Sequence, residues 1–332
     1  MNPASAAVIG AGLAGIACAR RLSAAGWQLR MFECQSAPGG RIATRRFEAA
    51  AFDHGAQYFN VHDGAFRALI ENAAEAGAAG HWRPRWAGGL QERDELWVGL
   101  PGMSALPRFL SQDLDIEYGA RIVRLERTGA GWTLIDDRGT SHADFGFVVL
   151  ALPAPEAATL AAPHTPLAAR VGAVPMAPCL AVMVAFAGSL GELPDAGFTD
   201  DAVLAWYARN GSKPGRDAPD AWVLHATADY SRGEFDAPPA RVQKALLARF
   251  SGQLGRNLPG VLLSDTHRWR HARVEAPLGE PYLFDGSANI GFCGDWCLDA
   301  RAEAAFLSGD AIGAALSETR SAESSGKMRG RQ

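Results

Sequence analysis

The sequence predicts an α/β fold of two interleaved domains. Two observations predict it: residues 6–33 have the pattern of a strand, a helix and a second strand, and strand-like runs recur from residue 116 to residue 270. A length of 332 residues corresponds to about two domains of roughly 150 residues each. Because 48% of the residues are hydrophobic and 20% are charged, the chain can form ordinary buried cores, and neither a disordered protein nor a disulfide scaffold is expected.

The first strand–helix–strand unit lies near the N-terminus. Residues 6–9 are an apolar run that ends in Gly10, which is typical of a buried strand. Residues 13–25 are rich in Ala and Leu, contain no proline and are followed by Gly26, so we expect a helix there. Residues 29–33 form the second strand, and a right-handed crossover joins the two strands.

The rest of the chain alternates between strand and helix patterns. Asp63 is a candidate N-cap for a helix over 63–77, and the tryptophans of 81–98 are expected in short strands and turns. The proline-rich stretch 153–178 predicts a crossing between the domains. The remaining strands are expected at 121–125, 132–135, 147–150, 180–187, 202–208, 221–227, 261–270 and 289–292, and the remaining helices at 238–254 and 300–317. Residues 319–332 are polar and lack apolar periodicity, so we expect a disordered tail.

Charge and cysteine content exclude several classes of function. The formal net charge of −4 gives no reason to expect nucleic acid or an anionic membrane as a partner. No basic residue precedes Arg20, and the longest apolar stretch, 179–187, is too short to span a bilayer, so we expect a cytoplasmic protein. The five cysteines are too scattered for a disulfide framework. Cys293 and Cys297 lack the further ligands of a zinc site, so we expect free thiols and no metal.

Residues 10–15 read G-x-G-x-x-G between the first predicted strand and helix. Gly10 permits a tight turn, Gly12 lets a pyrophosphate approach the backbone at the positive end of the helix, and Gly15 allows close helix–strand packing. Glu33 ends the next strand, where a carboxylate can accept both hydroxyls of an adenosine ribose and disfavours a 2′-phosphate. The pattern therefore predicts a Rossmann-type dinucleotide site.

Three later segments extend this fingerprint. Gly40 and Arg41 follow a second glycine, the stretch 52–58 reads Phe-Asp-His-Gly-Ala-Gln-Tyr, and 291–295 is a predicted strand that ends in Gly-Asp before a helix. Together with the first motif, these segments resemble the flavin-containing amine oxidase superfamily. The resemblance implies an FAD cofactor, with 52–58 passing under the flavin ring and Asp295 binding the ribitol chain.

The resemblance also implies a role for the helix that follows Asp295. Its N-terminal amides, at 301–304, would face the C2 carbonyl of the flavin, and the positive helix end would stabilise the negative charge of reduced flavin. Ala304 departs from the family pattern, in which glycine is commoner there. The residues expected to hold FAD are Gly10, Gly12, Leu13, Ala14, Gly15, Glu33, Gly40, Arg41, Ala56, Gln57, Tyr58, Val123, Gly294, Asp295, Ala302, Glu303 and Ala304.

Within the superfamily, the sequence is most similar to the bacterial renalases, from about residue 6 to residue 318. The segments that carry this likeness are 97–104, 210–216, 266–270, 294–297 and 303–309. The likeness implies an oxidase that takes a hydride from dihydronicotinamide isomers of NAD(P)H and passes the electrons to oxygen, giving hydrogen peroxide. No second G-x-G-x-x-G lies between a strand and a helix pattern, so a pyridine nucleotide would be a substrate. Such a hydride transfer needs no catalytic protein base.

Four residues are candidates for substrate binding: Asn210, Lys213 and Arg216, on a loop rich in Gly and Pro, and His267, on a strand. Two alternatives stay open. Lys213 and Arg216 can instead lie on a solvated turn, and His267 can be a hydrogen-bonded structural residue.

The predicted fold class is α/β, a Rossmann-type FAD-binding domain with an interleaved α+β substrate domain. We assign 1–60, 100–152 and 286–318 to the FAD-binding domain and 61–99 and 153–285 to the substrate domain, with the flavin ring between the two. Two other functions remain: an amine oxidase or desaturase acting on another small donor, and a non-catalytic dinucleotide sensor.

Overall fold

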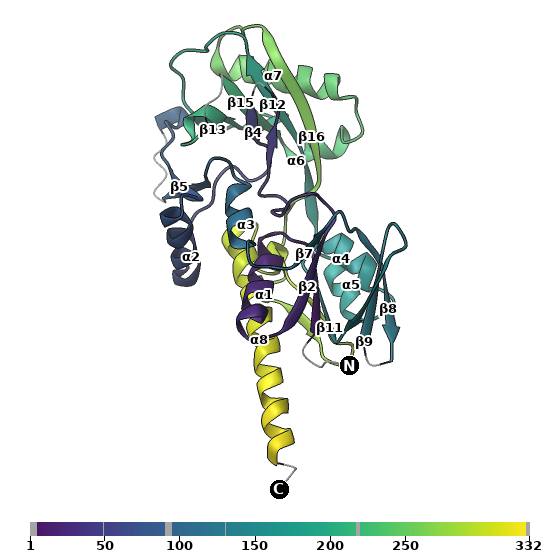
Figure 1. Ribbon diagram of the computed structural model, residues 1–332. Coiled ribbons are helices and arrows are strands. Elements are labelled where there is room, and N and C mark those ends of the chain that lie inside the picture. The colour runs from purple at the N-terminus through teal and green to yellow at the C-terminus, as the bar shows by residue number, and fades with distance from the viewer. Residues whose placement is uncertain (1–4, 49, 90–94, 130, 217–219, 330–332) are drawn as a thin grey trace. The chain divides into compact units, whose positions relative to one another are not determined.

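The computed structural model describes residues 5–48, 50–89, 95–129, 131–216 and 220–329 (Figure 1). The chain divides into two compact units, each built from separate stretches of sequence. Unit 1 comprises Met1–Gly40, Pro107–Met176 and Val274–Gln332, and unit 2 comprises Arg41–Leu106 and Ala177–Arg273. The division differs from the predicted domains: 41–60 and 100–106, expected with the FAD-binding domain, fall in unit 2, and 153–176 and 274–285, expected with the substrate domain, fall in unit 1.

Unit 1 is centred on a mainly parallel sheet. β1 (Ser5–Ile9) lies in the interior of this sheet, paired in parallel with β2 (Gln28–Glu33) and β11 (Phe147–Leu150). The six strands lie in the order β17-β18-β11-β1-β2-β7. The strands not yet given are β7 (Ile116–Tyr118), β17 (Leu283–Asp285) and β18 (Ile290–Phe292). All five residues of β1 are buried, as expected for a parallel strand covered on both faces.

Two helices from opposite ends of the sequence pack together in unit 1. They are α1 (Leu13–Ala24) and α8 (Ala302–Arg329) (Figure 1). A Cβ placed on Gly309 of α8 would lie 1.9 Å from the carbonyl oxygen of Ala14 in α1, and one on Gly313 would lie 2.7 Å from the Cβ of Arg21. The two helices therefore cross with backbone against backbone, which requires residues without side chains at the crossing.

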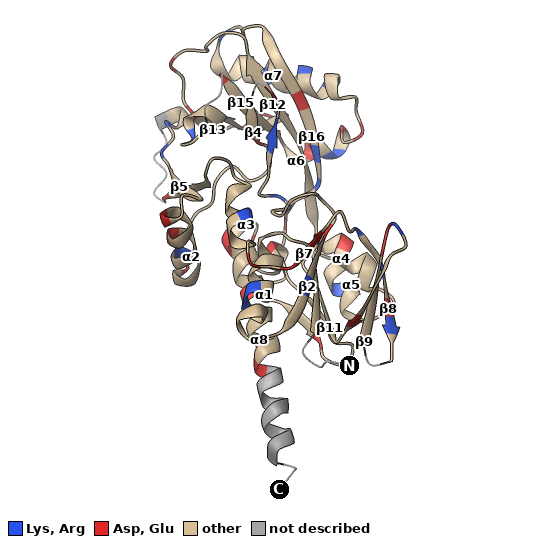
Figure 2. Cartoon of the chain, viewed as in Figure 1, with Lys and Arg blue, Asp and Glu red and all other residues tan. Residues whose placement is uncertain are grey.

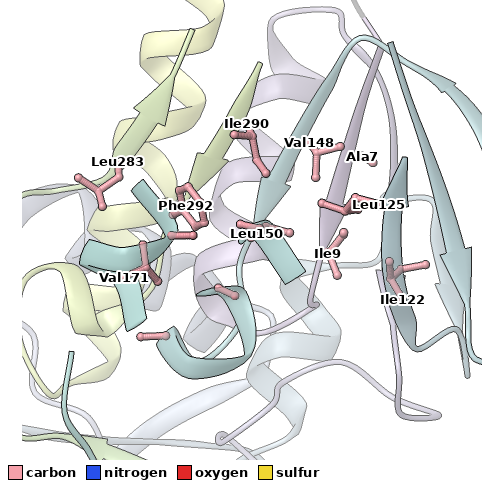
Figure 3. Close-up of a cluster of buried hydrophobic side chains, with 14 of the residues drawn as sticks. Ala7, Ile9, Ile122, Leu125, Val148, Leu150, Val171, Leu283, Ile290 and Phe292 are labelled. Carbon is pink, nitrogen blue, oxygen red and sulfur yellow. The ribbon is translucent and has the colours of Figure 1, made fainter. Parts of the chain in front are cut away.

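The apolar core of unit 1 joins the sheet to further elements (Figure 3). Ile9, Val148 and Leu150 from the parallel strands pack with Leu125 of a three-stranded antiparallel sheet and Val171 of a helix. The antiparallel sheet consists of β8 (Ile122–Thr128), β9 (Gly131–Asp136) and β10 (Ser141–Phe145), of which the sequence analysis missed β10.

The stretch 153–178 is not simply a crossing between domains. It forms α4 (Ala154–Ala161) and α5 (Leu167–Gly172), and Pro153 and Pro166 stand at the N-caps of these two helices. Proline is tolerated at a helix start because the first backbone N–H groups have no partner inside the helix. Ala154, Ala157 and Val171 are fully buried in the core of unit 1.

Unit 2 contains an antiparallel sheet in the order β13-β14-β15-β12-β16. These strands are β13 (Ala196–Phe198), β14 (Leu204–Arg209), β15 (Ala221–Ala226), β12 (Met176–Phe186) and β16 (Val261–Val274). α7 (Pro239–Leu254) packs against it through Val242, Leu246 and Phe250. The other elements are β3 (Thr44–Arg46), β4 (Ala51–Asp53), α2 (Gly64–Glu75), β5 (Ala79–Trp82), η1 (Ala87–Gly89), β6 (Leu96–Gly99), η2 (Asn210–Ser212) and α6 (Ala228–Gly233). α3 (Ala105–Leu110) lies at a division between the units, and η3 (Asp295–Cys297) precedes α8 in unit 1.

The tail prediction was wrong for the part that the structure describes. α8 continues to Arg329, because 319–329 contain no proline and carry helix-forming Ala, Glu and Lys; residues 330–332 lie outside the described residues. Basic and acidic residues are interspersed along the elements of both units (Figure 2). Among the described helices, none combines the length and the apolarity that crossing a membrane requires.

Candidate functional site

The glycine motif forms the turn between β1 and α1. Gly10 has φ +101°, and a Cβ there would lie 2.5 Å from the carbonyl oxygen of Ala151, so only glycine fits. Gly12 is the N-cap of α1, and a Cβ on it would meet no atom within 4 Å, which leaves open space at the helix start. The first turn of α1 carries no acidic residue. Leu13, Ala14 and Gly15 form that turn, and the arrangement fits an anionic pyrophosphate.

The Glu33 carboxylate braces this turn. It is 6% exposed, and its Oε2 accepts a hydrogen bond from the backbone N–H of Ala11 at 2.9 Å. Its Oε1 accepts from the N–H of Gln35 at 2.8 Å. Each carboxylate oxygen can accept a second hydrogen bond, so Glu33 can hold the turn and still receive a ribose hydroxyl. The residues of the turn and Glu33, predicted from sequence, are thus brought together within unit 1.

The second glycine pair lies beside the same turn. Gly39 donates its N–H to the carbonyl of Ala11 at 2.8 Å, and Gly40 has φ +54° with its Cβ position 3.7 Å from the Cα of Gly12. Arg41 is the first residue of unit 2, and its guanidinium donates to the carbonyl of Ala272 at 3.1 Å.

The Gly-Asp motif after β18 is buried. Gly294 donates its N–H to the hydroxyl of Ser308 at 3.0 Å, and Asp295 is 6% exposed. α8 begins at Ala302, two residues later than predicted, and Glu303 lies buried in its first turn with Ala304. The carboxyl group of Glu303, one of the residues predicted to hold FAD, is therefore buried at this helix end. Val123, also predicted to hold the cofactor, is 52% exposed on β8.

In unit 2, Asp53, which the sequence analysis did not list as a site residue, is the centre of a buried charge cluster that includes Lys213 and Arg216. Oδ2 of Asp53 accepts from the Lys213 ammonium at 3.2 Å and from Nη2 and Nε of Arg216 at 2.6 and 3.2 Å. Oδ1 accepts from the hydroxyl of Thr44 at 2.7 Å and from the N–H of Met103 at 2.9 Å. The Asp53 carboxylate and the Lys213 side chain are fully buried, and Arg216 is nearly so.

Two amide side chains complete this cluster. Asn210 accepts from the N–H of Asp53 at 3.2 Å and donates to the carbonyl of Ala51 at 2.8 Å. Gln57 donates to the carbonyl of Asp53 and accepts from Lys213 at 3.1 Å. We call this set the Asp53 cluster: Thr44, Asp53, Gln57, Met103, Asn210, Lys213 and Arg216.

The charges in the Asp53 cluster shift two pKa values. Burial opposes the ionisation of Asp53, but Lys213, Arg216 and the N–H of Met103 together lower its pKa to about 2. Burial also lowers the pKa of Lys213 to about 8, with Asp53 opposing this change and Arg216 reinforcing it. The alternative of a solvated turn is therefore wrong for Lys213 and Arg216, because their charged groups are buried and bound to Asp53.

Beside this cluster, unit 2 holds a group of neutral histidines. The His54 ring lies 4.6 Å from that of His267 and 5.2 Å from that of Trp269, while His225 and Trp269 both contact the carbonyl of His54. Burial lowers the pKa of His54 to about 3, and those of His225 and His267 to about 4. His267 therefore belongs to a group of packed aromatic rings with His54 and Trp269.

The segment 52–58, predicted to pass under the flavin ring, is held by contacts within unit 2. Ala56 donates its N–H to the carbonyl of Arg41 at 2.9 Å, and a Cβ on Gly55 would lie 2.0 Å from that oxygen. The ring of Tyr58 lies 6.0 Å from those of Trp82 and Trp206. Asp53 and His54 lie in this segment, and the signal that could have identified Asp53 is a lone carboxyl at the end of the buried run Ala51–Asp53.

Comparison with protein families gives two matches, each of which includes residues of both units. Residues 8–73 match the NAD(P)-binding Rossmann-like domain. Residues 65–312, more than half of the chain, match the flavin containing amine oxidoreductase family. The chain belongs to this family. It is an FAD-dependent oxidoreductase, which confirms the predicted cofactor and decides against a non-catalytic sensor.

Solved structures of low sequence identity share the fold. A protein provisionally named a protoporphyrinogen oxidase, from Exiguobacterium sp. 255-15, has a TM-score of 0.76 at 12% identity, covering 96% of this chain and 100% of its own. A wild-type putrescine oxidase bound to putrescine has a TM-score of 0.69 at 12% identity, covering 94% of this chain and 98% of its own. These similarities confirm the predicted α/β architecture of the flavin amine oxidases.

Proposed function

We propose that this FAD-dependent oxidoreductase is a renalase-like oxidase whose donor is a dihydronicotinamide isomer of NAD(P)H. The donor loses a hydride to become NAD(P)⁺, and O₂ takes up the two electrons, that hydrogen and one solvent proton to become hydrogen peroxide. Bound FAD supplies the two-electron acceptor between donor and oxygen. Unlike the cofactor assignment, the donor is our inference.

The observation that carries this proposal is the nucleotide turn of unit 1, formed by residues 10–15 and Glu33, which we call the cradle. In it the Glu33 carboxylate accepts a hydrogen bond from the N–H of Ala11, beside the start of α1, which no side chain caps. FAD is the occupant that the family assigns to it. Since the sequence has no second G-x-G-x-x-G between a strand and a helix pattern, a pyridine nucleotide would have to bind as a substrate elsewhere.

The lysines favour this donor over an amine. Amine oxidases of the superfamily often use a lysine that binds water near the flavin, and the sequence has three lysines, one of them, Lys327, in the C-terminal stretch. Lys213 is fully buried and bound to Asp53 and Gln57, and Lys244 is exposed on α7. Hydride transfer from a dihydropyridine needs no such group and no protein base.

For the residues, we propose that the cradle, Gly294, Asp295 and the start of α8 hold FAD, with Gly40, Arg41, Val123 and residues 56–58 contributing as the family resemblance implies. His267, which is partly buried, remains a candidate to contact the donor. Asn210, Lys213 and Arg216, the other candidates for donor binding, would act indirectly, because their polar groups bind Asp53 and its neighbours.

Anaerobic stopped-flow reduction of the FAD-loaded protein tests the proposal. We expect dihydronicotinamide isomers reduced at a ring position other than C4 to bleach the flavin absorbance rapidly, while ordinary NADH and putrescine do so slowly. Readmission of air should then yield one hydrogen peroxide per donor oxidised. Bleaching by amines alone would refute the proposed donor and favour an amine oxidase.

A further inference from the structure

One carboxylate joins four separate stretches of unit 2. Asp53 ends β4, Thr44 lies on the paired strand β3, Met103 precedes α3, and Lys213 and Arg216 lie after η2. Five hydrogen bonds from these residues end on the two carboxylate oxygens of Asp53, whose side chain is fully buried. The cluster therefore fixes a point where these stretches meet.

The chain that leaves this point is residues 54–58. The backbone of Asp53, directly before this segment, is fixed at both of its polar groups. Its N–H donates to Asn210, and its carbonyl accepts from the side chain of Gln57. Gln57 is in turn bound by Lys213. A shift of the Asp53 carboxylate would thus be transmitted to the start of the segment, through the Asp53 backbone, and to Gln57 near its end.

We propose that Asp53 is a positioning residue that sets the conformation of residues 54–58, with Lys213 and Arg216 as the cations that hold it in place. The inference rests on the proposed function only in that the family resemblance assigns this segment to the flavin ring. It adds a role for a residue that no motif match assigns, and it explains why the Asn210–Arg216 loop is built of polar groups that face inward.

The charge balance of the cluster guides the choice of variants. Two cations face one carboxylate, and the other neighbours of Lys213 are neutral: Gln57, the Trp82 ring at 5.3 Å from the ammonium, and His225. Lys213→Met leaves Asp53 paired with Arg216, so the protein should still fold. Asp53→Asn leaves two buried cations without a counter-charge and is expected to unfold the unit, so it is not the primary test.

The test combines Lys213→Met with a matched pair at Thr44. Thr44→Val removes the hydroxyl that binds Asp53 at nearly constant volume, and Thr44→Ser keeps it. As a control, Arg85→Met breaks the ion pair between Arg85 and Asp195, which lies in unit 2 outside the Asp53 cluster. Hydrogen exchange of the full-length chain without added FAD measures the segment directly, and the absorbance and fluorescence of bound FAD measure its effect on the cofactor.

We expect Lys213→Met and Thr44→Val to raise amide exchange of the peptide over 52–58 about tenfold and to alter the spectrum of bound FAD. Thr44→Ser and Arg85→Met should leave both unchanged. Unchanged exchange in Lys213→Met and Thr44→Val, or a rise spread evenly over unit 2, would overturn the inference, as would a loosened segment with an unaltered flavin spectrum. Neither readout uses a donor, so a wrong donor assignment leaves this test intact.

Discussion

At the scale of single residues, the Glu33 carboxylate holds the turn between β1 and α1, and we propose that it also binds the ribose of FAD. Its carboxylate satisfies the N–H groups of Ala11 and Gln35, and it ends the strand beside the nucleotide turn. A buried N–H that loses its acceptor costs about 1–3 kcal/mol. Removing this carboxylate should therefore disturb the turn as well as the ribose contact.

We expect Glu33→Ala to weaken FAD binding about ten- to a hundredfold, measured by fluorescence titration of the protein freed of cofactor. The matched control is Glu117→Ala, because Glu117 lies on the neighbouring strand β7 and pairs with Arg30. Equal FAD affinity in Glu33→Ala and the control would contradict the role assigned to Glu33.

At the scale of elements, the contact between α1 and α8 depends on glycine. The Cβ position of Gly309 lies 1.9 Å from a backbone oxygen of α1, which cannot move aside without shifting the helix. Gly252, inside α7, has no atom within 4 Å of its Cβ position. Replacing each glycine by alanine therefore tests the same substitution where there is no room for a Cβ, at Gly309, and where there is room, at Gly252.

We expect Gly309→Ala to lower the free energy of unfolding by about 1–3 kcal/mol through overpacking. Gly252→Ala should raise it by about 0.5–1 kcal/mol, since alanine is the better helix former. Urea unfolding of the two variants beside the wild type gives both values. A Gly309→Ala protein as stable as Gly252→Ala would mean that the helices do not cross as described.

The sequence predicted those elements whose signals are local. Residues 10–15 and Glu33 lie together because a parallel β–α–β unit brings the strand ends together, and this geometry follows from the sequence pattern alone. The helices that begin after Pro153 and Pro166 were not predicted, because a proline that starts a helix looks the same in sequence as one that breaks it. The Asp53–Lys213 pair could not be predicted, because 160 positions separate the two residues in sequence and no local sequence pattern indicates such a contact.

At the scale of the whole molecule, the buried histidines of unit 2 make stability depend on pH. Burial lowers the pKa values of His54, His225 and His267 to about 3–4, below the ordinary value of 6.5. Below pH 6.5 the unfolded chain binds protons that the folded chain does not, so acid favours unfolding. Stability is therefore expected to fall as the pH is lowered from about 6.5 to about 4, and to be insensitive to these groups above pH 7.

Each such histidine contributes a loss of up to about 1.4 kcal/mol per pH unit in that window. We expect His267→Gln to unfold with a shallower pH dependence than the wild type, measured by urea unfolding at pH 7, 6 and 5. Parallel slopes for His267→Gln and the wild type would show that His267 is not kept neutral by the fold.

The pairing of β18 with β11 and of α8 with α1 has a consequence for biosynthesis. Unit 1 is completed only when β18 and α8 have been translated, whereas unit 2 ends at Arg273. A nascent chain arrested before β18 therefore presents β11 with one edge of its sheet unpaired.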